Sequence, residues 1–402
     1  MKDNTETVIH KEVIKMSNLQ ALDKTYIANT YARFPVELVS GKGSLLKGAD
    51  GKDYIDMGSG IAVNGFGAAD DLWMQAVIDQ LGKIPHSSNL YYTEPGAKLA
   101  ELLCKRTGMK KVFFGNSGAE ANECAIKVAR KYSADQKGPG CYTIVTLKNS
   151  FHGRTLATLS ATGQDHYHEL YQPLVPGFEH IAPGDMDALK AIDAKTPVAG
   201  IMIECVQGEG GVVPLEAGFV HALAEYAHAN DIPLMVDEVQ TGNGRSGALY
   251  AYMTFGIQPD IVSTAKGLGG GLPIGACLMG EKVQDVLAPG DHGSTFGGNP
   301  AVCAGAVSIL SRIDDALLEG VRQRSAYIFE QLTGAPGVEG VSGLGLMIGV
   351  KTTRPAREIV MQCLENGVLF LTAKDRVRLL PALNIPMDLL ERAIAVLKEA
   401  CA

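Results

Sequence analysis

The sequence of 402 residues is poor in aromatic side chains and has no paired cysteines. Phe, Trp and Tyr make up 6% of it, and there is a single Trp. The eight cysteines are scattered, and no two of them form a C-x-x-C pair. This spacing argues against a disulfide framework and suits a reducing compartment. We therefore expect a cytoplasmic protein.

Long hydrophobic runs and an excess of positive charge are also missing. The longest stretch without Asp, Glu, Lys or Arg, residues 292–311, is interrupted by Gly297-Gly298-Asn299-Pro300 and is no membrane span. The net charge of −8 argues against nucleic acid or an anionic membrane as the main partner. Residues 1–18 mix Lys, Glu and Asp without an apolar run, so we expect a polar tail rather than a secretory signal.

Signals for a bound metal or a nucleotide-binding loop are missing or weak. His166 and His168 are not joined by further ligands at zinc-like spacing, so we expect no metal. The pattern G-x-x-x-x-G-K-[ST] does not occur, which excludes a Walker A loop. Residues 242–247 match G-x-G-x-x-G, but the nearby acidic residue, Asp260, precedes the next predicted strand instead of following it. A dinucleotide-binding fold is therefore disfavoured.

From about residue 110, apolar runs typical of strands alternate with helical periodicity. Helical spacing is clearest at 121–132 and 219–230. The predicted strands are 111–114, 142–147, 198–206, 232–236 and 261–265. This alternation predicts an α/β fold in which helices wrap a mostly parallel sheet. Such sheets bind ligands beyond the carboxyl ends of their strands.

The two ends of the chain have a different pattern. Residues 42–57 predict a hairpin with an Ala-Asp-Gly turn. A long helix is expected after residue 300, followed by an α+β pattern that ends in a helix at 387–402. We therefore predict a smaller α+β domain beside the large one. The predicted division is a tail at 1–18, a segment at 19–69 that joins the small domain, a large domain at 70–300 and the small domain at 301–402.

A carboxylate and an amine follow two of the predicted strands. Asp237 comes directly after 232–236, and Lys266 comes directly after 261–265. Pyridoxal 5′-phosphate (PLP) needs a lysine at its aldehyde and often an Asp at its pyridinium nitrogen. Taken singly, each residue also fits an ordinary surface lysine or a helix-capping aspartate. Their matched positions at strand ends favour a PLP site.

A phosphate-binding segment is expected near this pair. Residues 115–120 lie between a predicted strand and a predicted helix, so their free amides are placed to face an anion. An ordinary Ser or Asn cap is the alternative for this segment. Phe151 offers an aromatic face for a ring.

Six runs in this order resemble the class III PLP-dependent aminotransferases, over essentially the whole chain from about residue 25. They are 116–123, 151–155, 204–211, 237–242, 264–267 and 294–300. The resemblance implies PLP-dependent transferase fold type I. Two positions differ from the usual family pattern: Cys205 stands where Pro is common, and residues 65–71 replace a Gly-His-x-His-Pro-like run.

The resemblance implies how the cofactor is held. It implies that Lys266 bonds the PLP aldehyde and then carries the proton of the reaction, while Asp237 pairs with the pyridinium nitrogen. The other residues implied to contact the cofactor are Ser117, Gly118, Ala119, Phe151, Val239 and Gln240. Thr295 is similar to a residue that contacts the phosphate in the neighbouring subunit, and Ser294 to one near that subunit's substrate. These two imply a homodimer with shared active sites.

The resemblance also implies the substrates. Within the family, residues 31–36, 88–95 and 378–381 are most similar to enzymes that act on N-acetylornithine, with 2-oxoglutarate as acceptor and glutamate as product. Arg154 is implied to bind the distal carboxylate of either substrate. Arg378 is implied to bind the α-carboxylate of glutamate, and Glu209 to pair with Arg378 when that carboxylate is missing. Surface or structural salt bridges are the alternative for both arginines.

Other donors stay open. Ornithine, succinylornithine, 4-aminobutyrate and N-succinyl-diaminopimelate suit the same family. Tyr31 is similar to a tyrosine of ornithine aminotransferases that contacts the donor's carboxylate. A PLP mutase or decarboxylase, or a protein that binds without catalysis, are the remaining alternatives.

Overall fold

The computed structural model describes residues 17–402, which fall into two compact units, one ending at Glu37 and one from Leu38 to Ala402. In the first unit, Ser17 caps helix α1 (Asn18–Tyr26) by accepting a hydrogen bond from the Gln20 amide at 3.1 Å. Arg33 pairs with Asp23 at 2.8 Å in the same unit. The predicted tail at 1–18 lies outside the described residues, except for Ser17 and Asn18, which begin this helix.

A seven-stranded sheet forms the centre of the second unit. Its strands, in spatial order, are β4 (Lys111–Gly115), β12 (Gly275–Met279), β11 (Ile261–Thr264), β10 (Leu234–Asp237), β7 (Val198–Ile203), β5 (Thr143–Leu147) and β6 (Phe178–Ile181). Only β12 of these runs against the others, because it is antiparallel to both β4 and β11. The mostly parallel sheet expected from the sequence is confirmed.

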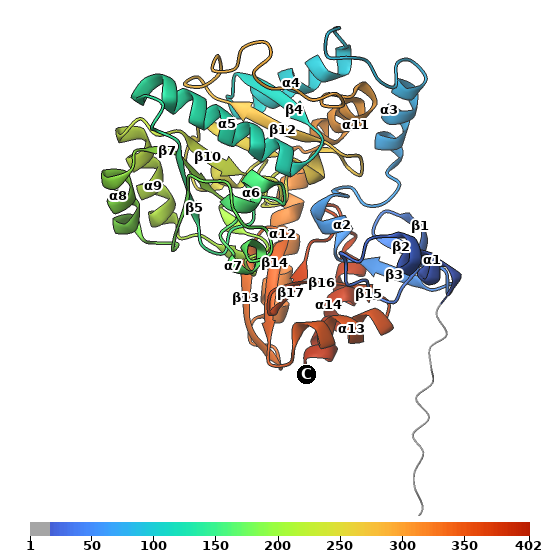
Figure 1. The fold of residues 1–402 in the computed structure, drawn as a ribbon. Coiled ribbons are helices and arrows are strands. Elements are labelled where there is room, and N and C mark those ends of the chain that lie inside the picture. The colour runs from blue at the N-terminus through green and yellow to red at the C-terminus, as the bar shows by residue number, and fades with distance from the viewer. Residues whose placement is uncertain (1–16) are drawn as a thin grey trace, which may run out of the picture. The chain divides into compact units, whose positions relative to one another are not determined.

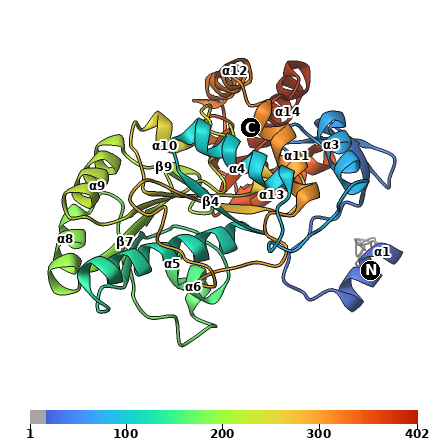
Figure 2. The same ribbon diagram turned by 90° about the horizontal axis from the view of Figure 1, so that it is seen from above.

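Both faces of this sheet are buried, which explains the near-continuous apolar strands. Alternate residues of each strand belong to different cores: Met235 packs with one, and Leu234 and Val236 with the other. Helix α5 (Gly118–Lys137) covers the first face. The helices that contribute to the second core are α4 (Glu94–Thr107), α8 (Met186–Lys195), α9 (Ala217–Ala229) and α11 (Pro300–Ser311). Figure 2 shows α5 and α4 on opposite sides of the sheet.

A four-stranded antiparallel sheet forms the C-terminal part of the same unit. Its order is β13 (Val338–Leu344), β14 (Met347–Thr352), β17 (Arg376–Leu379) and β16 (Leu371–Ala373). The helices near it are α12 (Asp315–Leu332), α13 (Ala356–Glu365) and α14 (Met387–Cys401), shown in orange and red in Figure 1.

The predicted hairpin at 42–57 is confirmed and is extended by one strand on each side. Strands β1 (Leu38–Lys42), β2 (Leu45–Gly48) and β3 (Asp53–Asp56) are antiparallel neighbours. Strand β15 (Val368–Leu369) then pairs with β3 in parallel. Residues more than 300 positions apart in the sequence therefore share one sheet.

Short elements connect these layers, and one of them, a 3-10 helix, begins with Lys266. They are α2 (Ser59–Ala62), α3 (Asp71–Leu81), α6 (Leu156–Ala161), α7 (Asp165–His168), β8 (Val206–Gln207), β9 (Val213–Pro214), α10 (Ala251–Thr254) and the 3-10 helix η1 (Lys266–Leu268).

The prediction of one long helix after residue 300 is wrong in one respect, because two helices occur there. Helix α11 ends at Ser311, and Asp314 caps α12 by accepting a hydrogen bond from the Leu317 amide at 2.8 Å. The Asp cap starts a new helix axis, so the periodicity restarts. The division into a large domain at 70–300 and a small one at 301–402 stays a prediction, because residues 38–402 group as one unit.

Candidate active site

Two neighbouring strands end where the sequence placed its carboxylate and amine. Asp237 is the last residue of β10, and its Cα partner on β11 is Ser263. Lys266 follows β11 after a single residue and adopts the left-handed backbone conformation, with φ of 45°. Asn243 holds this turn by donating to the Thr264 hydroxyl at 2.9 Å and to the Ala265 carbonyl at 3.2 Å. Both functional groups therefore lie at the same edge of the sheet.

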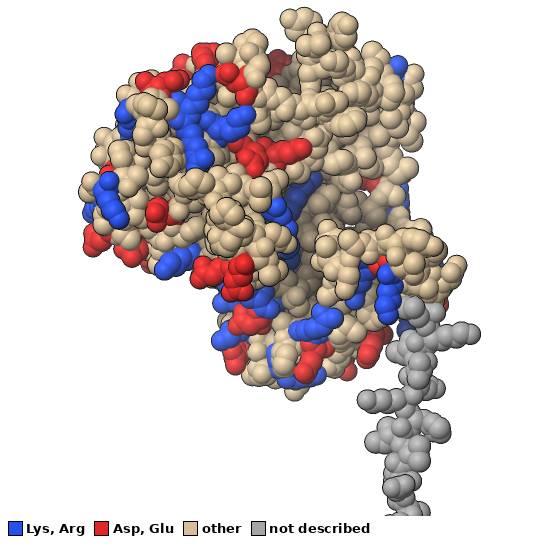
Figure 3. All heavy atoms as spheres, in the orientation of Figure 1, with Lys and Arg blue, Asp and Glu red and all other residues tan. Residues whose placement is uncertain are grey.

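A cavity of about 520 Å³ opens at this edge. It brings together nine of the residues singled out from the sequence: Ser117, Gly118, Ala119, Phe151, Arg154, Asp237, Val239, Gln240 and Lys266. Figure 3 shows the molecule hollowed on this face, with basic side chains inside the hollow. The volume and the mixed polar and apolar lining suit a small organic ligand.

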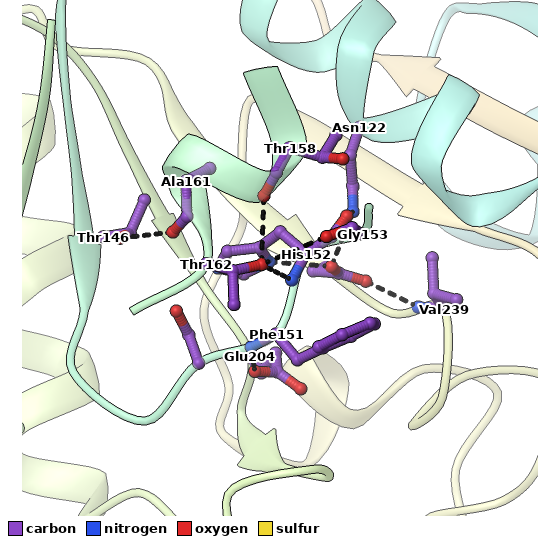
Figure 4. Close-up of polar contacts among 12 residues, drawn as sticks. Asn122, Thr146, Phe151, His152, Gly153, Thr158, Ala161, Thr162, Glu204 and Val239 are labelled. Atoms are coloured by element: carbon purple, nitrogen blue, oxygen red, sulfur yellow. Dashed lines mark hydrogen bonds and ion pairs between the residues drawn. The ribbon is translucent and has the colours of Figure 1, made fainter. Parts of the chain in front are cut away.

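Asp237 is buried and fully engaged by hydrogen-bond donors. One carboxylate oxygen accepts from the Asn122 amide at 2.8 Å and lies 2.8 Å from His152 Nδ1. The other oxygen accepts from the Val239 backbone N–H at 3.0 Å. Asn122, His152 and Val239, which are labelled in Figure 4, therefore meet at this carboxylate. These hydrogen bonds fix the orientation of the carboxylate.

Burial lowers the pKa of Lys266 to about 8, although Glu209 and Asp237 favour its charged form. Arg378 adds to the lowering, because it is a second cation near the amine. A lysine with this pKa carries a substantial neutral fraction near pH 7–8 and is suited to accept a proton.

The N-terminus of α5 forms the opposite wall. Ser117 caps the helix by accepting a hydrogen bond from the Glu120 amide at 3.2 Å, and the helix then begins with Gly118 and Ala119. A side chain at Gly118 would meet Val239 at 2.7 Å, so glycine allows this close approach. The free amides and the helix dipole make this end attractive to an anion.

Arg154 has no ion-pair partner among the described residues 17–402. Its guanidinium lies 4.9 Å from the ring centre of Tyr167 and 5.8 Å from that of Phe151. These cation–π contacts hold the side chain at the cavity without neutralising it. The arrangement leaves Arg154 able to bind a carboxylate.

Arg378, which is buried, and Glu209, which is half-buried, form an ion pair beside the cavity. Gln240 contacts both side chains, each at 3.4 Å. Burial raises the pKa of Glu209, but the charge and hydrogen bond of Arg378 outweigh it and lower that pKa below the usual value. Arg378 Nε is buried without a hydrogen-bond partner in the described part of the chain. A buried guanidinium N–H left in this way is available to a ligand carboxylate.

Of the remaining three predicted residues, two line a second cavity and one belongs to the other unit. Ser294 and Thr295 line a neighbouring cavity of about 440 Å³. Asn116 borders both cavities and donates to the Ser294 hydroxyl at 3.1 Å. Tyr31 belongs to the first unit, and its ring lies 5.4 Å from the Arg33 guanidinium.

Comparison with known proteins identifies the family of the chain. A family model described as "Aminotransferase class-III" matches residues 26–401. The chain belongs to the class III aminotransferases. It is 49% identical to the acetylornithine aminotransferase of Haemophilus ducreyi over 95% of this chain and 98% of that one. It is 45% identical to the acetylornithine aminotransferase of Aquifex aeolicus, over 93% and 99% of the two chains.

Solved structures of class III aminotransferases have the same fold. The ornithine aminotransferase of Toxoplasma gondii superposes with a TM-score of 0.91 at 30% identity, over 95% of this chain and 94% of that one. The N-acetylornithine aminotransferase of Stenotrophomonas maltophilia gives a TM-score of 0.82 at 33% identity, over 94% and 97%. This protein is therefore a PLP-dependent aminotransferase of fold type I, which acts on an amine donor and a keto acid.

The cavity of this aminotransferase fits PLP by the chemistry of its groups. It offers an amine for the aldehyde, a carboxylate for the pyridine nitrogen and a helix N-terminus for the phosphate. Phe151 and Val239 supply apolar walls for the ring. We expect Lys266, Asp237 and the first residues of α5 to hold the cofactor.

Three residues of the site were not assigned a role from the sequence. Asn122 and His152 bind Asp237 from positions 115 and 85 residues away. Glu204 follows β7 directly and is buried at the cavity wall. Each lies inside one of the six family runs, which was the available signal. Asn122 lies within helix α5, so no strand or loop end marked it.

Residues 17–402 contain neither a candidate membrane span nor a candidate metal site. No helix there is long and apolar enough to cross a membrane. No group of three or more His, Cys, Asp or Glu side chains in that range is arranged to hold a metal ion.

Proposed function

We propose that this aminotransferase moves the terminal amine of N-acetylornithine to 2-oxoglutarate, which gives N-acetylglutamate 5-semialdehyde and glutamate. The observation that carries the proposal is the Arg378–Glu209 ion pair beside Lys266. Glutamate has an α-carboxylate on the reacting carbon, whereas the terminal amine of acetylornithine has none there. An arginine that a neighbouring glutamate can neutralise suits both substrates. The names of the similar enzymes support the same donor and a place in arginine biosynthesis.

The chain's own residues then perform defined tasks. PLP, when bound, supplies an electron sink for the substrate carbon. Lys266 takes the proton from the substrate at Nζ and returns it, since burial lowers the pKa of Lys266 to about 8. Asp237, fixed by His152 and Asn122, stabilises positive charge at the pyridine nitrogen. Arg154 binds the distal carboxylate of either substrate, and Gln240, which lines the cavity, would contact the phenolic oxygen of PLP.

We further propose a homodimer with shared sites in the cytoplasm. The segment at 84–92 is tied to the 294–297 loop, because Asn89 donates to the carbonyls of Ser294 and Gly297, both at 2.9 Å. Exposed apolar side chains occur on both segments, at Ile84, Leu90, Tyr91, Tyr92 and Phe296. Exposed apolar side chains next to Thr295 support a subunit interface there. All eight cysteines are free, which supports a reducing compartment.

The test is a panel of amine donors with 2-oxoglutarate, ranked by kcat/KM. The panel contains N-acetylornithine, ornithine, N-succinylornithine, 4-aminobutyrate and N-succinyl-diaminopimelate, and Lys266→Ala is the inactive control. We expect N-acetylornithine to lead by about tenfold or more, the range that pocket contacts provide between analogues. Ornithine is the second candidate, because the chain also superposes closely on an ornithine aminotransferase. A different leading donor would replace the proposed substrate, and amino exchange with none of them would overturn the proposal.

A further inference from the structure

Glu204 is a buried carboxylate at the cavity wall to which the proposed mechanism gives no task. It directly follows β7, and the residue as a whole is only 5% exposed. The preceding residue, Ile203, is paired with Val236, which directly precedes Asp237. Glu204 and Asp237 therefore lie beside each other at the ends of adjacent strands.

Glu204 binds two different loops, one with each carboxylate oxygen. Oε2 accepts from the backbone N–H of Phe151 at 2.9 Å, as Figure 4 shows, and Oε1 accepts from that of Gly208 at 3.2 Å. The first loop leads to Arg154, and the second leads to Glu209. These are the two loops that carry the groups proposed to bind or replace substrate carboxylates.

The two loops also contact each other, so their relative position depends on the two hydrogen bonds that Glu204 accepts. Gln207 donates to the Lys148 carbonyl at 2.9 Å. A side chain at Gly208 would meet Gln240 at 2.8 Å, which means that the Gly208 backbone lies directly against the glutamine that contacts Glu209. Loss of the Gly208 hydrogen bond would therefore free the start of the Glu209 loop.

The ionised form of Glu204 accepts both N–H groups, one with each carboxylate oxygen. Protonation converts one oxygen to a hydroxyl, which is a weaker acceptor, and a glutamine replaces one oxygen by an NH₂ group, which is only a donor. One of the two buried N–H groups then has a weaker partner or none, which is costly inside a protein. The charge state of Glu204 thus decides how firmly both loops are held.

Burial raises the pKa of Glu204 to about 7, against the lowering by His152 and by the two backbone N–H groups. Asp237 adds to the rise, because it is a neighbouring carboxylate. The other titratable groups that interact electrostatically with Glu204 are Cys205 and Lys266. Glu204 therefore changes charge close to neutral pH.

We propose that Glu204 is a positioning residue whose ionised carboxylate holds the Phe151–Arg154 loop and the Gly208–Glu209 loop in the arrangement that binds both substrates. The inference rests on the proposed function, because it assigns Arg154 and Glu209 to substrate carboxylates. Protonation of Glu204 releases one loop and weakens substrate binding without removing Lys266 or Asp237.

The first experiment compares the pH profiles of the wild-type holoenzyme and Glu204→Gln with both substrates. We expect Glu204→Gln to lower kcat/KM about tenfold for glutamate and for N-acetylornithine, chiefly through KM, because one buried N–H is left unpaired. We also expect the wild-type rise in KM below about pH 7, here called the acid limb, to disappear in this variant, whereas the dependence of kcat on Lys266 remains. A retained acid limb in KM, or unchanged KM values, would overturn the proposal.

Glu238→Gln is the matched control. Glu238 is equally buried, and burial raises its pKa to about 7 as well. Its oxygens accept from the Thr241 hydroxyl at 2.5 Å and the Tyr252 amide at 2.8 Å, so it ties neither of the two loops. We expect this variant to lose thermal stability while it keeps the acid limb. Loss of the limb in Glu238→Gln alone would assign the limb to Glu238 and reject Glu204.

A second measurement does not depend on activity or on the folding of a variant. Hydrogen exchange of the wild-type holoenzyme, corrected for intrinsic rates, is compared at pH 8 and pH 6. We expect peptides covering Phe151 and Gly208 to lose protection at pH 6, while β5 keeps it. Unchanged protection of both peptides would contradict the proposal that Glu204 holds both loops. If N-acetylornithine proved not to be the donor, the exchange result would still stand.

Discussion

At the scale of single residues, Asp237 and Lys266 lie at one edge of the sheet because each stands at the end of a strand. Nothing in local spacing indicated that His152 and Asn122 would be the partners of Asp237. Those contacts depend on loops and a helix that meet only after folding.

The Glu209–Arg378 pair leads to a prediction at this scale. Glu209→Ala leaves the buried Arg378 without its carboxylate whenever the substrate brings none. We expect the half-reaction with N-acetylornithine to slow by about tenfold or more, because an unpaired buried charge is costly. The half-reaction with glutamate, which supplies its own carboxylate, should change by less than about threefold. Stopped-flow measurement of each half-reaction separates the two.

A matched substitution is available for that experiment. Glu216 is exposed and makes no capping hydrogen bond with its side chain, so Glu216→Ala should leave both half-reactions unchanged. Equal slowing of the two half-reactions by Glu209→Ala would contradict the exchange of partners at Arg378.

At the scale of elements, the predicted strands and helices are confirmed to within a few residues, and the errors have local causes. The run at 198–206 is a strand only to Ile203, because the chain then turns to place Glu204 in the cavity wall. Residues 65–71, which depart from the usual family pattern, contain the cap of α3. Asp70 accepts from the Trp73 amide at 2.9 Å and also pairs with Arg312 at 2.7 Å.

This cap gives a prediction about stability. Asp70→Ala removes both the helix cap and the ion pair with Arg312, so we expect a loss of about 1–2 kcal/mol in the free energy of unfolding. The matched variant is Asp71→Ala, which removes an exposed pair with Lys42 and should cost less than about 1 kcal/mol. Urea denaturation of both variants measures the difference. Equal losses would show that the cap is not what anchors α3.

At the scale of the whole molecule, the proposed dimer explains two features that have no role in a single chain. Thr295 lines a different cavity from Lys266, and the adjacent Phe296 is an exposed apolar side chain. A partner subunit that covers this surface would receive Thr295 at its own cofactor site. Each active site would then be formed by residues of the six family runs from two chains.

Mixing two inactive variants tests this arrangement. Lys266→Ala and Thr295→Glu carry lesions that fall in the same site of a mixed dimer, so its other site is intact. We expect random pairing to restore about a quarter of the wild-type activity after subunit exchange. Lys266→Ala mixed with Asp237→Ala is the control, because both lesions then stay with their own chains and no intact site forms. No recovery in the first mixture, with mixed dimers verified by mass, would contradict shared sites.

The sequence by itself determined the fold class, the positions of most strands and the identity of the lysine and carboxylate. These follow from local periodicity and from residues that stand at strand ends, which short-range pattern reveals. Only the tertiary structure decided which groups neutralise, orient or desolvate them. Arg378 meets Glu209 across 169 positions, and Glu204 joins loops that start at Phe151 and Gly208. Burial and hydrogen-bond partners are set by packing between distant segments, and the pKa of each buried group follows from that packing.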